Sequence, residues 1–196
     1  MLLCDLFEKY VSDKWDWHDY GQFYGPMLQH KKDTAENVLE VGIKGGSSIA
    51  AWKEYFTKAM IVGIDNEKQD EIKDDRIICL YGNAYDTDFL DLNLVGIKWD
   101  VVIDDGSHYK EDQLVFLNYF YDKLNNGGIL FIEDIGEIWE QGTQTYYTCD
   151  DTLNYLYDNF EGDSKYLTVI DRERSSRFRN HPRNDEHALM YYPEGS

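Results

Sequence analysis

Short apolar runs rich in β-branched residues alternate along the chain with longer stretches whose apolar residues recur at helical spacing. The runs Val101–Ile103 and Ile129–Ile132 contain no alternating polar positions, which is typical of strands buried on both faces of a sheet. The apolar runs predict seven strands, at Val38–Val41, Met60–Ile64, Arg76–Leu80, Trp99–Ile103, Gly128–Ile132, Tyr166–Ile170 and Ala188–Tyr192.

The alternation of strands with helices predicts an α/β fold, Rossmann-like and doubly wound, with a mostly parallel seven-stranded sheet. Only the polar segment 172–186 separates the last two strands, so we expect them to form an antiparallel edge pair. We expect one domain over residues 1–196, in which 1–30 form an N-terminal helical cap and 36–196 form the core. The helices of the core are expected near residues 47–57, 67–73, 86–92, 110–123 and 150–160.

The composition narrows the range of partners. The chain has 196 residues and a formal net charge of −19, which repels phosphate groups and disfavours nucleic acids and anionic membranes. Its 42% of hydrophobic residues is enough to bury a core. No run approaches the roughly 18–20 apolar residues of a membrane span, Met1–Asp5 has no basic segment, and the three cysteines lie far apart. We therefore expect a cytoplasmic protein without nucleic-acid or membrane partners.

A glycine-rich turn follows the first strand. Gly42 begins the turn, and Ser47 follows as a good helix N-cap. Glycines allow close approach of the backbone to a ligand, and a helix start offers N–H groups to an anion. Asp65 ends the second strand, where an acid can accept hydrogen bonds from both hydroxyls of a ribose. Together they favour an adenosine-containing cofactor; the alternative is a tight turn and a strand that happens to end in an acid.

Two further strands end in paired acids. Asp104 and Asp105 follow one apolar run, and Glu133 and Asp134 follow the next. Because ligands of open α/β sheets bind at the carboxyl ends of strands, we expect Asp105, Glu133 and Asp134 to converge if the two strands are neighbours. Clustered carboxylates repel one another unless a cation is present, and oxygen ligands suit a hard divalent ion such as Mg²⁺.

His108 lies three residues after Asp105, in the segment Asp105-Gly106-Ser107-His108. A neutral imidazole beside a hydroxyl that a metal ion has acidified can remove its proton near neutral pH. The alternative is a loop histidine that is hydrogen-bonded to the backbone. Its link to two acidic strand ends favours the functional interpretation.

These motifs resemble the metal-dependent sugar O-methyltransferases of the macrocin and mycinamicin type and the related cephalosporin-hydroxylase-like proteins. The resemblance covers most of residues 12–135, and the Asp-Asp-Gly-Ser-His and Glu-Asp-Ile segments are its most specific part. It also includes Asp13-Lys14-Trp15, His18, Tyr20 and Tyr24, Leu39-Glu40-Val41-Gly42 with Gly45-Gly46-Ser47, Trp52, Tyr55-Phe56, Val62-Gly63-Ile64-Asp65 and Asn126-Gly127-Gly128.

The resemblance implies a role for each matching residue. His108 would be the general base, and Tyr20 and Tyr24 would lie over the cofactor unless they serve helix packing. Some relatives carry an additional domain, which leaves the oligomeric state and the substrate pocket of this chain open. The resemblance implies Asp105, Glu133 and Asp134 as Mg²⁺ ligands, and Glu40, Gly42, Ser47, Asp65 and Asp104, with Asn83 near the adenine, as residues that hold S-adenosylmethionine.

The sequence thus predicts a single methyltransferase domain that uses S-adenosylmethionine and Mg²⁺ to methylate a sugar hydroxyl, with Asp105 and His108 as catalytic residues. Whether the acceptor is free, nucleotide-linked or attached to a glycan stays open. One alternative is a catechol-type O-methyltransferase, which typically has Asp-Asn and Lys at the positions of Glu133-Asp134 and His108. Another is a non-catalytic module that binds a nucleoside or sugar. A nicotinamide oxidoreductase is disfavoured because the turn departs from G-x-G-x-x-G.

Arginines concentrate in one segment near the end of the chain. One interpretation is a solvated loop whose positive charges partly balance the negative charge of the rest of the protein. The other is a binding site for an anionic acceptor, since a guanidinium group can form two parallel hydrogen bonds to a phosphate or carboxylate. The segment contains Arg172, Arg174, Arg177, Arg179 and Arg183.

Overall fold

The computed structural model describes residues 1–196 apart from 17–19, 69–71, 141–142, 147–148, 172–186 and 194–196. The chain divides into two compact units, Met1–Val101 and Val102–Ser196, which are taken in turn below. No helix of the described residues is long and apolar enough to cross a membrane. The expectation of one methyltransferase domain over the whole chain stays a prediction.

The main sheet has seven strands in the order β3-β2-β1-β4-β5-β9-β8. β1 pairs with β2 and β2 with β3 in parallel, whereas β9 is antiparallel to both β5 and β8. This confirms the predicted α/β fold and its antiparallel edge pair. The strands are β1 Asn37–Val41, β2 Met60–Asp65, β3 Ile77–Tyr81, β4 Trp99–Asp104, β5 Leu124–Ile135, β8 Leu167–Asp171 and β9 His187–Tyr191.

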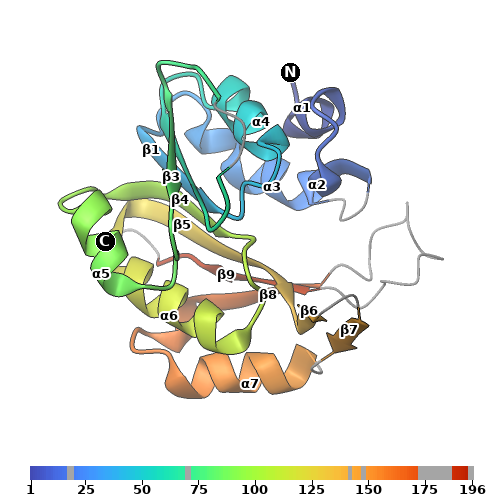
Figure 1. Cartoon of the computed structure of the whole chain (residues 1–196), viewed down its shortest axis with the longest axis vertical. Helices are drawn as coiled ribbons and strands as arrows, with labels where there is room; N and C mark the ends of the chain where they lie inside the picture. Colours follow the sequence, from blue (N-terminus) through green and yellow to red (C-terminus); the bar gives the residue numbers. More distant parts are fainter. Residues whose placement is uncertain (17–19, 69–71, 141–142, 147–148, 172–186, 194–196) are drawn as a thin grey trace. The chain divides into compact units, whose positions relative to one another are not determined.

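Helices α1 and α3 pack together in the first unit, and α1 also packs on α4 (Figure 1). Aromatic rings form their interface: Trp52 of α4 meets Phe7 of α1 edge-on at 4.9 Å and Tyr24 of α3 at 5.2 Å between ring centroids. Edge-to-face contacts of this kind add to the burial of apolar area. The helices of this unit are α1 Leu3–Lys9, α2 Asp13–Asp16, α3 Gly21–Leu28, the 3₁₀ turn η1 Gln29–Lys31, α4 Ser47–Tyr55 and α5 Thr87–Leu94.

The prediction of a helix near 67–73 is wrong. Residues 66–68 and 72–73 are not helical, and 69–71 lie outside the described residues. The physical reason is in the sequence, because Ile72 is the one apolar residue between Glu67 and Lys73, so a helix here would have no apolar stripe to bury. The side chain of Ile72 lies instead against the glycine turn at Gly46.

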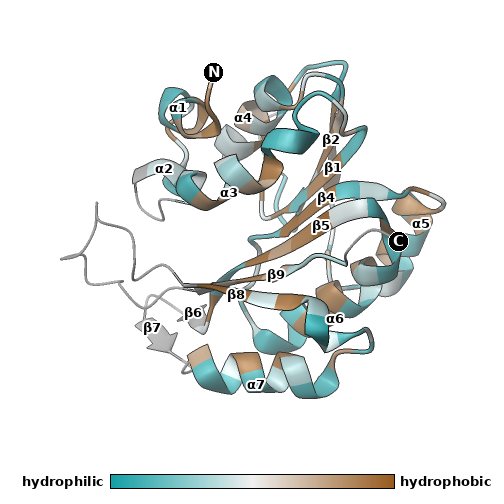
Figure 2. Ribbon diagram, turned by 180° about the vertical axis from the view of Figure 1, so that it is seen from behind, coloured by the Kyte–Doolittle hydropathy of each residue, from teal (hydrophilic) through white to brown (hydrophobic). Residues whose placement is uncertain are grey.

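In the second unit, α6 (Lys110–Phe120) and α7 (Cys149–Asn159) pack on each other and on β5 (Figure 1). Much of β5 is coloured as hydrophobic in Figure 2, which agrees with burial of Ile129–Ile132 in the core. Sequence analysis missed a small antiparallel hairpin of β6 (Glu137–Glu140) and β7 (Thr143–Tyr146). The 3₁₀ turns η2 Tyr121–Lys123 and η3 Ser164–Tyr166 complete the unit.

The glycine turn joins β1 to α4. Gly46, not Ser47, is the N-cap of α4, with a left-handed φ of 79°, and Ser47 is the first helical residue. The predicted N-cap was therefore one residue late. Glycine is favoured here because a side chain is strained at positive φ.

We predict that Gly46→Ala lowers the free energy of unfolding by about 1–2 kcal/mol, since alanine strains at positive φ and its Cβ meets Ile72. Gly45→Ala is the matched control, because a Cβ at Gly45 has nothing within 4 Å. Urea denaturation followed by circular dichroism measures both. Equal stability of the two variants would contradict the assignment of strain to Gly46.

Candidate functional site

The candidate cofactor residues of the first unit gather where three parallel strands end together. Val41 of β1 pairs with Ile64 of β2, and Asp65 pairs with Tyr81 of β3, so the three carboxyl ends are in register. The backbone N–H of Gly42 donates to the carbonyl of Ile64 at 2.9 Å. This edge is where open α/β sheets bind ligands.

Asp65 holds the glycine turn in place. Its Oδ2 accepts the N–H groups of Ile43 at 3.1 Å and Lys44 at 2.9 Å, and its Oδ1 accepts the N–H of Glu67 at 2.9 Å. A carboxylate offers about four lone-pair positions, so these three bonds leave capacity for a ligand hydroxyl. Sequence analysis placed Asp65 at the end of the strand but did not foresee that it also fixes the turn.

Glu40 is buried and belongs to a polar network. Its Oε2 accepts a hydrogen bond from Ser48 Oγ at 2.6 Å, and its Oε1 lies 3.3 Å from Lys14 Nζ. The exposed fractions of the Lys14 and Glu40 side chains are 1% and 0%. The network ties α2 to β1 and to the first turn of α4. Burial in this network means that Glu40 contributes to the shape of the turn.

The remaining candidates of the first unit differ in exposure. Asn83 is exposed in the turn after β3, where its Oδ1 accepts the N–H of Tyr85 at 3.0 Å. Tyr20 and Tyr24 are each 2% exposed, and their rings lie 6.1 Å apart. Tyr24 also contacts Phe7 and Trp52, so it takes part in helix packing, and a place for the two tyrosines over the cofactor stays a prediction.

In the second unit, a short loop carries the residues that follow β4. Asp104 is the last residue of β4, is 2% exposed, and accepts the N–H of Gly106 through Oδ1 at 3.3 Å. Ser107 Oγ donates to Asp112 of α6 at 2.6 Å, which holds the loop against the helix start. His108 then has a φ of 61°, in the left-handed region that is unusual for a non-glycine residue.

Asp134 lies in an irregular part of β5. The strand continues to Ile135, so Glu133 and Asp134 do not follow its end as the sequence suggested. The pairing with β9 shifts register between Ile132 and Ile135, and Asp134 has a φ of 50°. A bulge of this kind redirects a side chain. Left-handed residues cost about 1–3 kcal/mol each and are concentrated at functional sites.

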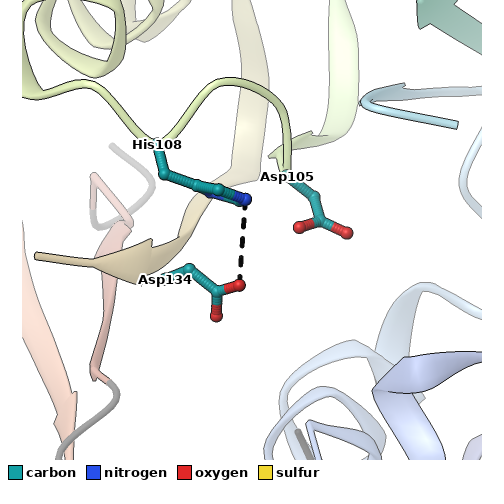
Figure 3. Close-up of side chains that lie close together, drawn as sticks. All are labelled: Asp105, His108 and Asp134. Atoms are coloured by element: carbon teal, nitrogen blue, oxygen red, sulfur yellow. Dashed lines mark ion pairs between the residues drawn. The ribbon is translucent and has the colours of Figure 1, made fainter. Parts of the chain in front are cut away.

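The structure brings Asp105, His108 and Asp134 together. One ligand atom from each lies within 4.8 Å of the others (Figure 3). His108 Nε2 is 3.9 Å from Asp134 Oδ2, and the side chains are 16% and 6% exposed. His108 Nδ1 is buried and has no hydrogen-bond partner among the described residues. Glu133, 1% exposed, is not part of this group, so its assignment as a ligand stays a proposal.

The group fits a hard divalent cation. Two ligand atoms on one Mg²⁺ are at most about 4.2 Å apart, which is twice a metal–oxygen distance of about 2.1 Å. The ligand atoms of Asp105 and Asp134 lie within 4.8 Å of each other, so small side-chain rotations would bring both carboxylates onto one ion. The 3.9 Å between Nε2 and Oδ2 is too long for a hydrogen bond. Mg²⁺ prefers carboxylate to imidazole, so the carboxylates suit the ion, and the imidazole suits a proton acceptor beside it.

Sequence analysis missed three supporting residues: Lys14, Asp112 and Gln113. Lys14 pairs with Glu40, Asp112 holds Ser107, and Gln113 Nε2 donates to the carbonyl of Glu133 at 3.2 Å. Lys14 lies within the resemblance described above, and that was its only signal. The other two are ordinary polar residues at the start of a helix, and only their contacts reveal them. The arginine segment 172–183 lies outside the described residues.

Comparison with known proteins decides the relationship. No family model matches the chain. The 8-demethyl-8-alpha-L-rhamnosyl tetracenomycin-C 2'-O-methyltransferase of Streptomyces olivaceus is 30% identical over 158 residues, which are 76% of this chain and 42% of that protein. The corresponding 3'-O-methyltransferase of the same organism is 33% identical over 141 residues, which are 66% of this chain and 36% of that protein. The chain is a homologue of sugar O-methyltransferases.

A solved homologue confirms the fold. The methyltransferase MycE of the mycinamycin biosynthetic pathway, in complex with Mg and SAH, superposes with a TM-score of 0.65 at 27% identity, over 69% of this chain and 40% of that one. This chain therefore has the Rossmann-like methyltransferase fold. The chain spans about two fifths of the length of the relatives that it matches.

We predict that Lys14→Met lowers the free energy of unfolding by about 3–5 kcal/mol, because it leaves the Glu40 carboxylate buried without its counter-charge. The double variant Lys14→Met with Glu40→Gln should recover much of that loss, since no buried charge then remains unpaired. Thermal and urea unfolding measure both variants. A double variant as unstable as Lys14→Met would show that charge pairing is not the cause.

Proposed function

We propose that the chain is an S-adenosylmethionine-dependent O-methyltransferase that acts on a sugar hydroxyl. The observation that carries this proposal is the group of Asp105, His108 and Asp134, because a catalyst needs a base beside a cation-binding pair and a simple binding module does not. The homology to tetracenomycin and macrolide sugar methyltransferases supports the same chemistry.

We infer that Asp105 and Asp134 hold a divalent ion, with Glu133 as a further ligand, and that His108 is the general base. A bound Mg²⁺ supplies Lewis acidity, which makes an acceptor hydroxyl easier to deprotonate. His108 Nε2 faces Asp134 and accepts that proton. The low exposure of both side chains limits competition from water. Orientation of the acceptor oxygen and removal of its proton are the protein's main contributions.

For the cofactor, we infer that the edge formed by β1, β2 and β3 holds S-adenosylmethionine, whose reactive group is its sulfonium methyl. Asp65 has lone pairs left for a ribose hydroxyl, and Asn83 is exposed after β3 for the adenine. Gly42 and Ser47 supply close backbone approach and a helix start. Glu40 acts by holding the turn through Ser48, and Asp104 stays a candidate contact.

The acceptor is proposed to be a glycoside. The chain's relatives include a rhamnosyl tetracenomycin-C 2'-O-methyltransferase, a mycinamicin VI 2''-O-methyltransferase and an L-olivosyl-oleandolide 3-O-methyltransferase. We propose that the methyl acceptor is a hydroxyl of a sugar attached to a larger aglycone or carrier. Its methylation would require the divalent ion inferred above.

We predict that the chain converts S-adenosylmethionine to S-adenosylhomocysteine in the presence of Mg²⁺ and rhamnosyl glycosides, and that EDTA abolishes the reaction until Mg²⁺ is restored. Mass spectrometry and NMR of the products identify the methylated oxygen. A catechol assayed in parallel tests the competing acceptor class. Turnover that EDTA leaves untouched, or methylation of the catechol alone, would overturn the proposal.

Two variants test the residue roles. His108→Ala should lower methyl transfer by about 10²-fold or more, because a general base typically contributes 10²–10⁴-fold, and Asp105→Asn should lower it as well, because it removes a carboxylate from the proposed ion site. Both should still bind S-adenosylhomocysteine, as measured by calorimetry. His30→Ala is the matched control, since His30 is an exposed histidine outside the site. Full activity of either site variant contradicts its assigned role.

A further inference from the structure

Two residues of the Asp105–His108–Asp134 group have left-handed backbone conformations, at φ 61° for His108 and 50° for Asp134. Neither is glycine, so each conformation needs support from its surroundings. The side chains that provide support come from consecutive positions at the start of α6, Asp112 and Gln113.

Gln113 anchors the strand next to Asp134. Its Nε2 donates to the carbonyl oxygen of Glu133 at 3.2 Å, and that carbonyl belongs to the peptide group that supplies the N–H of Asp134. The φ angle of Asp134 is a rotation relative to this peptide plane. A hydrogen bond that holds the plane sets the direction of the N–Cα bond from which the Asp134 side chain extends, and so narrows the positions that its carboxylate can take.

Packing alone does not require an amide at this position. Gln113 is 1% exposed, and its Oε1 is buried without a hydrogen-bond partner among the described residues. A buried polar atom without a partner is unfavourable, and an apolar side chain of similar size would avoid it. A buried polar atom without a hydrogen-bond partner is expected mainly where the side chain serves a function.

Asp112 supports the other strained segment. Its Oδ2 accepts the hydroxyl of Ser107 at 2.6 Å, and Ser107 Oγ in turn accepts the N–H of Tyr109 at 3.3 Å. These bonds lie on either side of His108 in the sequence. The start of α6 thus holds both the loop that carries the imidazole and the peptide that precedes Asp134.

We propose that Gln113 is a positioning residue for the divalent-ion site, acting through the Glu133–Asp134 peptide, with Asp112 in the same role for the His108 loop. This rests on the proposed function only in that the site takes a divalent cation. Residues that orient metal ligands typically change metal affinity 10–100-fold when they are substituted.

The test is Mn²⁺ binding to the full chain, measured by electron paramagnetic resonance, with Mg²⁺ as competitor. Gln113→Leu should weaken Mn²⁺ affinity at least tenfold. Its melting temperature and its affinity for S-adenosylhomocysteine should stay close to those of the wild type. A merely structural role would instead lower the melting temperature and leave the metal affinity of the folded protein unchanged.

Asn118→Leu is the matched control on the same helix. Its Nδ2 donates to the carbonyl of Asn159 at 3.4 Å, and its Oδ1 accepts the N–H of Glu161 at 2.9 Å, so it also links α6 to backbone. Asn118→Leu should bind Mn²⁺ as the wild type does. Gln113→Met, with an unbranched side chain, gives the same test if leucine does not pack.

The outcomes separate this proposal from the proposed function. Wild-type Mn²⁺ affinity in Gln113→Leu and Gln113→Met, or an equal loss in Asn118→Leu, overturns the positioning role. A wild-type chain that binds neither Mn²⁺ nor Mg²⁺ overturns it as well. If the wild type binds Mn²⁺ and Gln113→Leu does not, the positioning role holds even where no sugar is methylated, and only the proposed function then fails.

Discussion

Repulsion between two carboxylates is the constraint around which the second unit is organised. Asp105 and Asp134 place ligand atoms within 4.8 Å of each other and of His108 in a partly buried setting. Like charges at this distance are unfavourable unless a cation lies between them. This unfavourable arrangement is the basis for proposing a divalent ion at the group.

The backbone around this group is also held in an unfavourable state. His108 and Asp134 are left-handed, and side chains at the start of α6 form hydrogen bonds to the residues that precede each of them, Ser107 and Glu133. Rigid placement matters because proton transfer and ion binding both depend on distances within fractions of an ångström. A helix that packs on the core is therefore also the scaffold of the site.

In the first unit, the corresponding feature is the glycine turn after β1, where backbone is accessible to a ligand. Asp65 fixes the glycine turn through N–H groups, while Lys14 and Ser48 hold the buried carboxylate of Glu40. Four N–H groups of the turn donate within the protein and so hold it in one conformation, those of Gly42, Ile43, Lys44 and Gly46. Both carboxylate oxygens of Asp65 accept backbone N–H groups, so the turn itself requires an acid, since an amide side chain has only one acceptor oxygen.

The sequence by itself determined the seven strands of the main sheet, the glycine turn and the acids near the strand ends, because buried runs and turn residues are local signals. Tertiary structure decided that β5 runs through Asp134 with a bulge and that Asp105, His108 and Asp134 come together. It also decided that Gln113 bonds the Glu133 carbonyl and that Lys14 pairs with Glu40. A bulge depends on pairing with β9, more than fifty residues away, and the Lys14–Glu40 pair joins residues on separate elements. Such contacts leave no periodic trace in the sequence, since they arise only when distant segments pack together.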